Sequence, residues 1–145
     1  MAMDFQRAIQ SALIADAQLA ALGVQEYRGA LAVFVEMPTP ADKDENKPYI
    51  YVSPPISSVL WDAKNKDGLE ETFDVQIWDG NSPKIPPYRV AAVSARVRKA
   101  LHQNVNLPVD GRQAIIVLAG GPTELDSAPI YVGRSVSVIV RHEEV

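Results

Sequence analysis

The chain has 145 residues, 47% of them hydrophobic and 22% charged, so it is long enough to bury one ordinary hydrophobic core. Its mean hydropathy is -0.06 and no apolar run approaches the roughly 18 residues of a membrane span, which argues against a membrane protein and against a disordered tail. The absence of cysteine excludes disulfides and cysteine metal sites, and a net charge of -4 disfavours a protein that clamps DNA, because nonspecific affinity for nucleic acid needs an excess of Lys and Arg.

A first helix is predicted where apolar residues recur every four positions. This spacing runs from Phe5 to Leu13, and Asp4 is placed to cap the first turn. Asp16 falls on the same apolar stripe, where a carboxylate would be buried, so we expect the helix to end or bend there. Asp16 would then cap a short second turn that ends at Gly23. The polar interruptions also argue against a secretory signal.

Two strands are predicted next, one on each side of an exposed loop. Residues 31–35, Leu-Ala-Val-Phe-Val, are of the β-branched and aromatic types that favour a strand. Residues 38–48 hold three prolines, five charges and no large apolar side chain, which is typical of an exposed loop. Residues 49–53 then alternate, with Ile50 and Val52 on one face.

A hairpin is predicted after these strands. The segment from Glu70 to Asp79 alternates, with aliphatic and Phe side chains on one face and polar side chains and Trp78 on the other. Asp67-Gly68 is a favourable tight-turn pair, so Leu60 to Lys66 is predicted to run back as the other arm.

A second helix follows a proline-rich linker. Three prolines between Asn81 and Pro87 predict the linker, and the last two open a helix that runs to His102. A turn is predicted beyond it at Asp110-Gly111. The apolar stripe of this helix consists of Val90, Val93, Val97 and Leu101.

The rest of the chain is predicted to be β-structure. The strands are Gln113–Ala119 and Ile130–Arg141, separated by a turn at Gly120-Gly121-Pro122 and a polar connector to Pro129. The order of elements lacks the regular βαβ alternation of a parallel sheet. The expected fold class is therefore α+β: a single domain over residues 1–145, with a mostly antiparallel sheet and two helices packed on one face.

Charge is unevenly distributed along the chain. The segment from Asn81 to Val109 contains five Lys and Arg residues and no acid, so the rest of the chain must sum to -9. A surface with regions of both signs can guide self-association. We therefore take Arg89, Arg96 and Lys99 as candidate protomer contacts; the alternative is an ordinary solvated helix face.

An acidic stretch in the predicted loop matches half of a calcium-binding pattern. Residues 42–46 read Asp-Lys-Asp-Glu-Asn, which follows D-x-D-x-N. Lys47 stands where the sharp turn needs glycine, and Ser53 stands where a bidentate carboxylate is needed, so we expect no metal. The acids that we keep as candidate partner contacts are Asp42, Asp44 and Glu45.

No motif for nucleophilic catalysis or for phosphate or dinucleotide binding is present. The nearest serine context, Gly133 to Ser137, lies in a predicted strand, and neither histidine is placed by the sequence to serve it. The neighbouring acids Glu70-Glu71 and Glu143-Glu144 point to opposite faces of a strand, so they are poor acid–base pairs and are predicted to be solvated. We predict no enzyme, no catalytic residue and no cofactor.

Four aromatic residues are candidates for contact with a partner. Tyr49, Tyr51 and Trp78 are predicted on strand faces opposite the aliphatic ones, and Trp61 precedes the predicted hairpin turn. Large aromatic side chains on a face that is not the core suggest contact with the second helix or with another chain.

The order of these segments resembles a family of phage tail-completion or tail-terminator proteins. Residues 8–22 resemble the family's Ala/Leu-rich first helix with its Asp-Ala break, and 48–52, Pro-Tyr-Ile-Tyr-Val, resemble its Pro-Tyr-Val strand. Residues 61–68 and 73–78 resemble its polar hairpin and the strand that ends in Trp. Residues 90–102 resemble its second helix. Together these stretches cover most of the chain.

The resemblance implies a structural role in a virion. It implies a homohexameric ring at the head–tail junction that caps the tail tube, ends its polymerisation and provides the surface on which the filled head docks. The implied partners are further copies of the chain, the tail tube protein and a head-completion or connector protein, with no membrane. DNA would pass through the lumen without specific binding, and the chain would lie in the host cytoplasm during assembly.

Two alternatives stay open at the level of sequence. The chain could be another neck or tail component, such as a head-closure or tail tube protein, which would polymerise differently. It could also be a small ligand-binding domain with a pocket under the sheet, although the sequence offers few polar residues for one.

Overall fold

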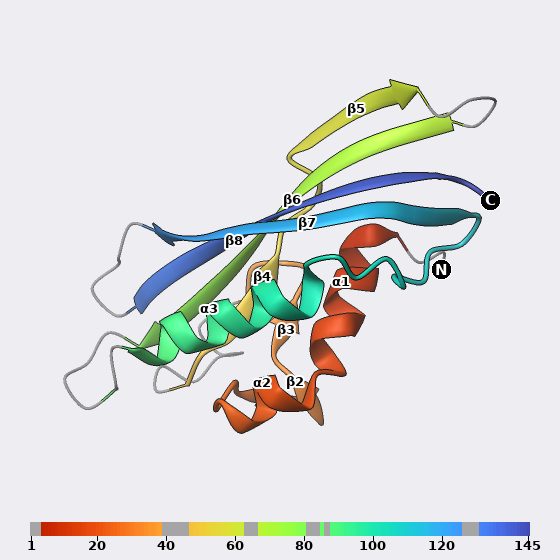
Figure 1. The fold of residues 1–145 in the computed structure, drawn as a ribbon. Helices are drawn as coiled ribbons and strands as arrows, with labels where there is room; N and C mark the ends of the chain where they lie inside the picture. The colour runs from red at the N-terminus through yellow and green to blue at the C-terminus, as the bar shows by residue number, and fades with distance from the viewer. Residues whose placement is uncertain (1–3, 39–46, 63–66, 81–84, 86–87, 126–130) are drawn as a thin grey trace.

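The computed structural model describes residues 4–38, 47–62, 67–80, 85, 88–125 and 131–145, with the backbone alone for 61, 62, 67 and 131. These residues form three helices and eight strands (Figure 1). In chain order the elements are α1 (Phe5–Ile14), α2 (Ala17–Ala21), β1 (Glu26–Tyr27), β2 (Ala30–Leu31), β3 (Val33–Phe34), β4 (Tyr49–Val52), β5 (Ser57–Asp62), β6 (Asp67–Gly80), α3 (Tyr88–Leu101), β7 (Arg112–Leu125) and β8 (Tyr131–Glu144).

A six-stranded sheet forms the centre of the fold. Its order is β3-β4-β6-β8-β7, and β5 pairs with the first half of β6. Every pair is antiparallel except β3 with β4, so the fold is α+β with a mostly antiparallel sheet, as predicted. The strands β6 and β8 pair over a long register that runs from Gly68 opposite Glu143 to Gly80 opposite Tyr131.

The hydrophobic core lies between one face of the sheet and the helices. The alternation predicted for β6 and β8 is confirmed, because Phe73, Val75 and Ile77 are buried beside Val136 and Val138. The helices α1 and α3 lie on the same side of the sheet (Figure 1). Each fully buried aliphatic side chain in such a core contributes about 1.5–3 kcal/mol. The helix residues in this core are Phe5, Ala8, Ile9, Leu13, Leu19, Val90, Val93, Val97 and Leu101.

The first two helices begin and end where the sequence predicts. The carboxylate of Asp4 accepts a hydrogen bond from the Arg7 N–H at 2.9 Å and so caps α1. The carboxylate of Asp16 accepts from the backbone N–H of Gln18 at 2.9 Å and caps α2. Gly23 follows α2 with a φ of +94°, a conformation that glycine adopts without strain.

The single strand predicted over residues 31–35 is divided. A small hairpin of β1 and β2 pairs Glu26 with Leu31, and β3 begins two residues later. Its turn consists of Arg28 and Gly29, both with positive φ, as a type I′ hairpin turn requires. Arginine is not a usual residue for the first of these positions, which explains why the sequence did not reveal the turn.

The predicted hairpin is present, but its turn is displaced. Asp67-Gly68 does not form the turn; these residues belong to β6, where they pair with Asp62 and Trp61 of β5. The arm predicted from Leu60 to Lys66 begins earlier, at Ser57. The connecting residues 63–66 lie outside the described part of the chain.

The predicted turn at Gly120-Gly121-Pro122 is a bulge inside a longer strand. The pairing of β7 with β8 shifts from Gly120 opposite Ser137 to Thr123 opposite Ser135. Gly121 and Pro122 thus oppose the single residue Val136, and this one extra residue is accommodated as a bulge, so β7 continues to Leu125. The polar connector predicted from Pro122 is therefore shorter, and residues 126–130 lie outside the description.

Close packing of Trp78 against β8 generates a stability prediction. A Cβ added at Gly133 would lie 2.5 Å from the Trp78 ring, so Gly133→Ala should destabilise the fold by about 1–3 kcal/mol. Gly120→Ala is the matched control, because a Cβ there has nothing within 4 Å, and its effect should stay within about 0.5 kcal/mol. Urea unfolding of both variants measures the difference, and equal effects would contradict this packing.

Candidate interaction surfaces

The first predicted contact residue, Arg89, is bound within its own chain. Its Nη2 lies 2.6 Å from Oδ1 of Asp79, and its Nε donates to Oδ2 at 2.8 Å. Asp79 is 2% exposed and lies near the end of β6 on the same face as the buried Val75 and Ile77, so the pair fixes the start of α3 to the sheet. Such a two-point contact between guanidinium and carboxylate is geometrically specific.

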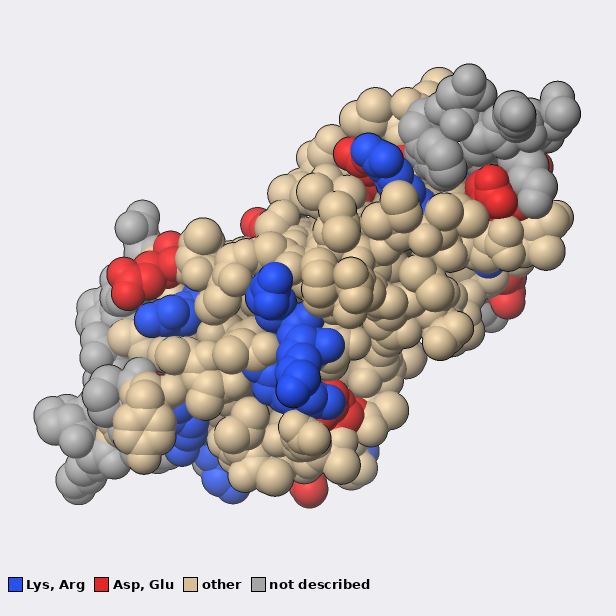
Figure 2. Space-filling model, in the orientation of Figure 1, with Lys and Arg blue, Asp and Glu red and all other residues tan. Residues whose placement is uncertain are grey.

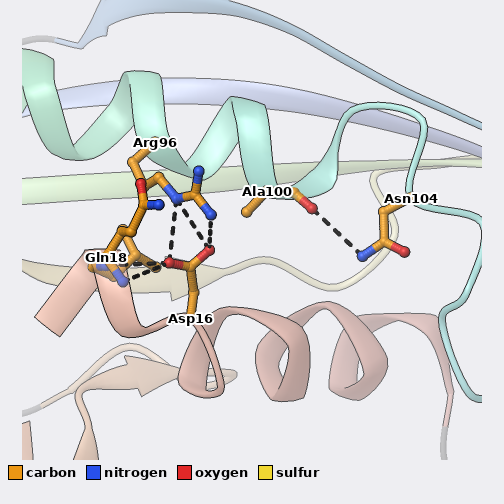
Figure 3. Close-up of polar contacts among 6 residues, drawn as sticks. Asp16, Gln18, Arg96, Ala100 and Asn104 are labelled. Atoms are coloured by element: carbon orange, nitrogen blue, oxygen red, sulfur yellow. Dashed lines mark hydrogen bonds and ion pairs between the residues drawn. The ribbon is translucent and has the colours of Figure 1, made fainter.

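The second predicted contact residue, Arg96, is also held internally. Figure 3 shows its guanidinium facing the carboxylate of Asp16, with Nη2 to Oδ2 at 2.7 Å. The same carboxylate accepts from the N–H groups of Gln18 and Leu19. One side chain therefore caps α2 and joins it to α3.

At the end of α3, Asn104 donates from Nδ2 to the Ala100 carbonyl.

These contacts determine the protonation of Asp16. Burial alone would raise its pKa, but the hydrogen bonds from Arg96 and from the N–H groups of Gln18 and Leu19, together with the charge of Arg96, outweigh burial. The result is a pKa below the ordinary value of 3.8. The hydrogen bond to Asp16 in turn raises the pKa of Arg96, so the pair is ionised at neutral pH.

Fewer positively charged side chains of α3 are exposed than the sequence predicted. Arg98 and Lys99 are both exposed in the last turn of the helix, where cations also complement the helix dipole. Figure 2 shows Lys and Arg side chains gathered over the C-terminal half of α3. Of the three predicted contacts on this helix, Lys99 keeps an exposed side chain, whereas Arg89 and Arg96 hold the fold together.

The predicted aromatic contacts divide in a similar way. Tyr49 pairs with Trp78, on the predicted face opposite the aliphatic one, but it is 3% exposed and its ring centroid lies 6.0 Å from that of Phe34, so it is buried within its own chain. Trp78 is half-buried against Gly133 and donates from Nε1 to Gln76 at 3.1 Å. Tyr51 is half-buried.

The remaining predicted contacts are described in part or not at all. Trp61 lies in β5 opposite Gly68, and its side chain is outside the description. Asp42, Asp44 and Glu45 fall in residues 39–46, which are outside it as well. They remain predictions.

A buried polar chain that the sequence did not reveal joins three strands. His142 is 1% exposed; its Nδ1 accepts from Arg112 Nε at 2.6 Å, and its Nε2 lies 2.6 Å from Oε1 of Glu71. Because the Arg112 N–H must donate, the neutral ring carries its proton on Nε2 and donates to Glu71. The ring also packs on Phe5 at 4.2 Å. The registers of β8 on β6 and on β7, which place Leu69 and Ala114 opposite His142, bring these residues together.

The neighbouring acid is paired too, which corrects the prediction that Glu70 and Glu71 are merely solvated. Arg141 donates from Nε to Glu70 at 2.6 Å on the other face of the sheet. The prediction that the two acids point to opposite faces is consistent with their different partners.

The buried polar chain borders a hollow. The hollow measures about 270 Å³, and no Ser, Thr, Cys or Lys is among the described residues that line it. The lining residues are Asp4, Phe5, Gln6, Pro55, Leu69, Glu71, Phe73, Val109, Arg112 and His142.

No cluster of three or more His, Asp and Glu side chains able to hold a metal ion occurs among the described residues. None of the helices described here has the length and apolar character needed to cross a bilayer.

The fold of this chain is similar to that of a protein of known structure. The chain is similar to a chain of the virion of a native gene transfer agent (GTA) particle, with a TM-score of 0.69 and 19% sequence identity. The similarity covers 96% of this chain and 92% of the other. No protein-family model and no curated protein matches the sequence.

The Asp16–Arg96 pair generates a pH-dependent prediction. Asparagine caps a helix as well as aspartate does, so Asp16→Asn removes mainly the charged contact and should cost about 1 kcal/mol at pH 7. Because folding lowers the pKa of Asp16, its contribution is present above pH 3.8 and is lost as pH falls through the folded-state pKa. The difference from the unmodified protein should therefore shrink toward pH 2.

Urea unfolding followed by circular dichroism at both pH values measures this effect. Asp4→Asn is the control, because its side chain caps α1 by accepting from the Arg7 N–H and its replacement should change little at either pH. A loss for Asp16→Asn that stays the same from pH 7 to pH 2 would rule out the charged contact as its cause.

Proposed function

We propose that this chain is a structural protein of a phage-like virion, and that it forms the ring that caps the tail tube at the head–tail junction. The observation that carries the proposal is the similarity of fold, over nearly the whole of both chains, to a chain of a gene transfer agent virion. The resemblance of the sequence segments to tail-terminator proteins supports the finer assignment. The proposal gives the chain no enzymatic activity.

The distribution of polar groups supports a role in assembly. The described acids and bases that lie close together are used in pairs that join elements, such as Arg89 with Asp79 and Arg96 with Asp16. A closed ring needs two different patches on each protomer. The basic end of α3, with Arg98 and Lys99, provides one patch, and the chain outside residues 81–109, with a net charge of -9, provides acidic surface for the other.

The partners follow from this role. The ring is a homohexamer that binds the tail tube protein on one side and a head-completion or connector protein on the other, within the virion. An overall charge of -4 suits a lumen through which DNA passes, because DNA would not adhere to an acidic wall.

Tail tubes from the same particle provide the test. Purified protein added to tubes should be found by electron microscopy at tube ends as a ring, and tubes grown in its presence should stop at defined lengths. Continued growth of tubes that incorporate the chain along their whole length would show a tube component instead. If the protein binds neither the ends nor the walls of the tubes, the proposed role in the virion is refuted.

Charge reversal on α3 tests the basic patch separately. Arg98→Glu with Lys99→Glu should raise the protein concentration needed for ring formation about tenfold, because like charges would then face each other. Arg28→Glu is the control, since Arg28 is exposed in the β1–β2 turn, away from α3. Light scattering across a dilution series gives both midpoints, and rings that form equally well with the double variant would remove the basic patch from the interface.

A further inference from the structure

The buried polar chain of Arg112, His142 and Glu71 contains a group that can change its charge near neutral pH. Histidine is the side chain that ordinarily does so between about pH 5 and pH 8. His142 is 1% exposed and both of its ring nitrogens are bonded, Nδ1 to Arg112 at 2.6 Å and Nε2 to Glu71 at 2.6 Å. Because the ring is closed off from water, its two partners must respond when its charge changes.

The two partners respond in opposite ways to a proton on Nδ1. The neutral ring accepts at Nδ1 from the Arg112 Nε–H and donates from Nε2 to Glu71. In the protonated ring both nitrogens are donors, so the contact with Glu71 becomes an ion pair and is strengthened. The contact with Arg112 is lost, because two N–H donors and two positive charges would face each other across 2.6 Å.

The charged groups around the ring come from three elements. Glu71 lies on β6 and Arg112 on β7, and Asp4 at the start of α1 lines the same hollow beside Phe5, whose ring packs on His142 at 4.2 Å. Among the described residues that line the hollow, Arg112 is the only one with a permanent positive charge, so it is the residue that a proton on the ring repels. The other lining residues are uncharged: Gln6, Pro55, Leu69, Phe73 and Val109.

The hollow beside the buried polar chain gives the Arg112 side chain room to move. Its volume is about 270 Å³, and Arg112 is one of the residues that line it. The guanidinium can therefore turn away from the ring into this space without displacing a core side chain. A side chain packed on all sides would have no such second position.

Arg112 also belongs to the turn that precedes β7. Its backbone N–H donates to the Val109 carbonyl at 3.4 Å, and these two residues form a β-bridge. Inside the turn, the Gly111 carbonyl accepts from the Val145 N–H at 3.1 Å. The first of these backbone bonds is long, so the contact of the Arg112 side chain with the His142 ring is an important anchor of the turn.

We propose that protonation of His142 switches the buried polar chain between two states, holding the ring on Glu71 and releasing Arg112 into the hollow. When the ring is neutral, it fixes the start of β7 to β6 by a contact on each side. When the ring is charged, the contact with β7 is broken and the turn at residues 109–112 is loosened. This inference goes beyond the proposed function and does not depend on it, because the switch lies within one copy of the chain.

Nuclear magnetic resonance of the full chain, isotope-labelled, tests the switch directly. The nitrogen signals of the His142 ring report its protonation, and hydrogen exchange of the Arg112 Nε–H reports its contact with the ring. Exchange is expressed relative to the exposed Arg98 in the same sample, which removes the intrinsic effect of pH on exchange. As the ring gains its proton, protection of the Arg112 Nε–H should fall about tenfold with the same midpoint, because a hydrogen bond from a charged group is lost.

Two variants assign the effect to the correct histidine. His142→Gln replaces the ring by an amide that offers an acceptor and a donor but does not titrate, so Arg112 should keep its protection from about pH 8 to about pH 5. His102→Gln is the matched control: it removes the other histidine of the chain, whose Nδ1 accepts from the Ala119 N–H, and should leave the response of Arg112 unchanged. If His142→Gln does not fold, the two signals of the unmodified chain decide the question by themselves.

Three results would each overturn the proposal. Protection of the Arg112 Nε–H that persists after the ring is protonated would show that both contacts coexist. A ring that stays neutral at about pH 5 in the folded chain would show that the switch does not operate in the range of an ordinary histidine. A loss of protection in His142→Gln equal to that in the unmodified chain would assign the effect to another group.

Discussion

The pairing of β8 with β6 on one side and β7 on the other positions the rest of the molecule. Side chains alternate along a strand, so a slip of one residue would turn Val136, Val138 and Val140 from the helices to the open face. The same pairings place His142 between Arg112 and Glu71. The core and the buried polar chain thus follow from one alignment of strands.

Two of the basic side chains of α3 stabilise the fold and are not available to a partner. Its Arg89 is joined to Asp79 at the end of β6, and its Arg96 is joined to Asp16, the residue that also begins α2. Losing one member of such a pair would leave a largely buried carboxylate without its partner, which costs more than the pair itself contributes. The charges left for assembly are those at the exposed end of the helix.

Much of the fold could be predicted from local patterns, whereas most of the candidate contacts could not. The helices and the alternating strands could be predicted because the spacing of apolar residues within each segment can be read directly from the sequence. The bulge at Gly120–Pro122 and the burial of Tyr49 depend on neighbouring strands that are distant in sequence. Likewise, Arg89 and Arg96 have the composition of a surface patch, and only their tertiary neighbours make them internal.

We propose that copies of this chain assemble into a closed ring. The mass of the purified chain in solution, measured by light scattering over a dilution series at low and high salt, tests this assembly. A ring of six copies should appear as a discrete hexamer at low salt that dissociates on dilution more readily as salt rises, because attraction between oppositely charged patches is screened. A monomer whose mass is the same at every concentration and salt, and which does not bind tail tube ends, would contradict it.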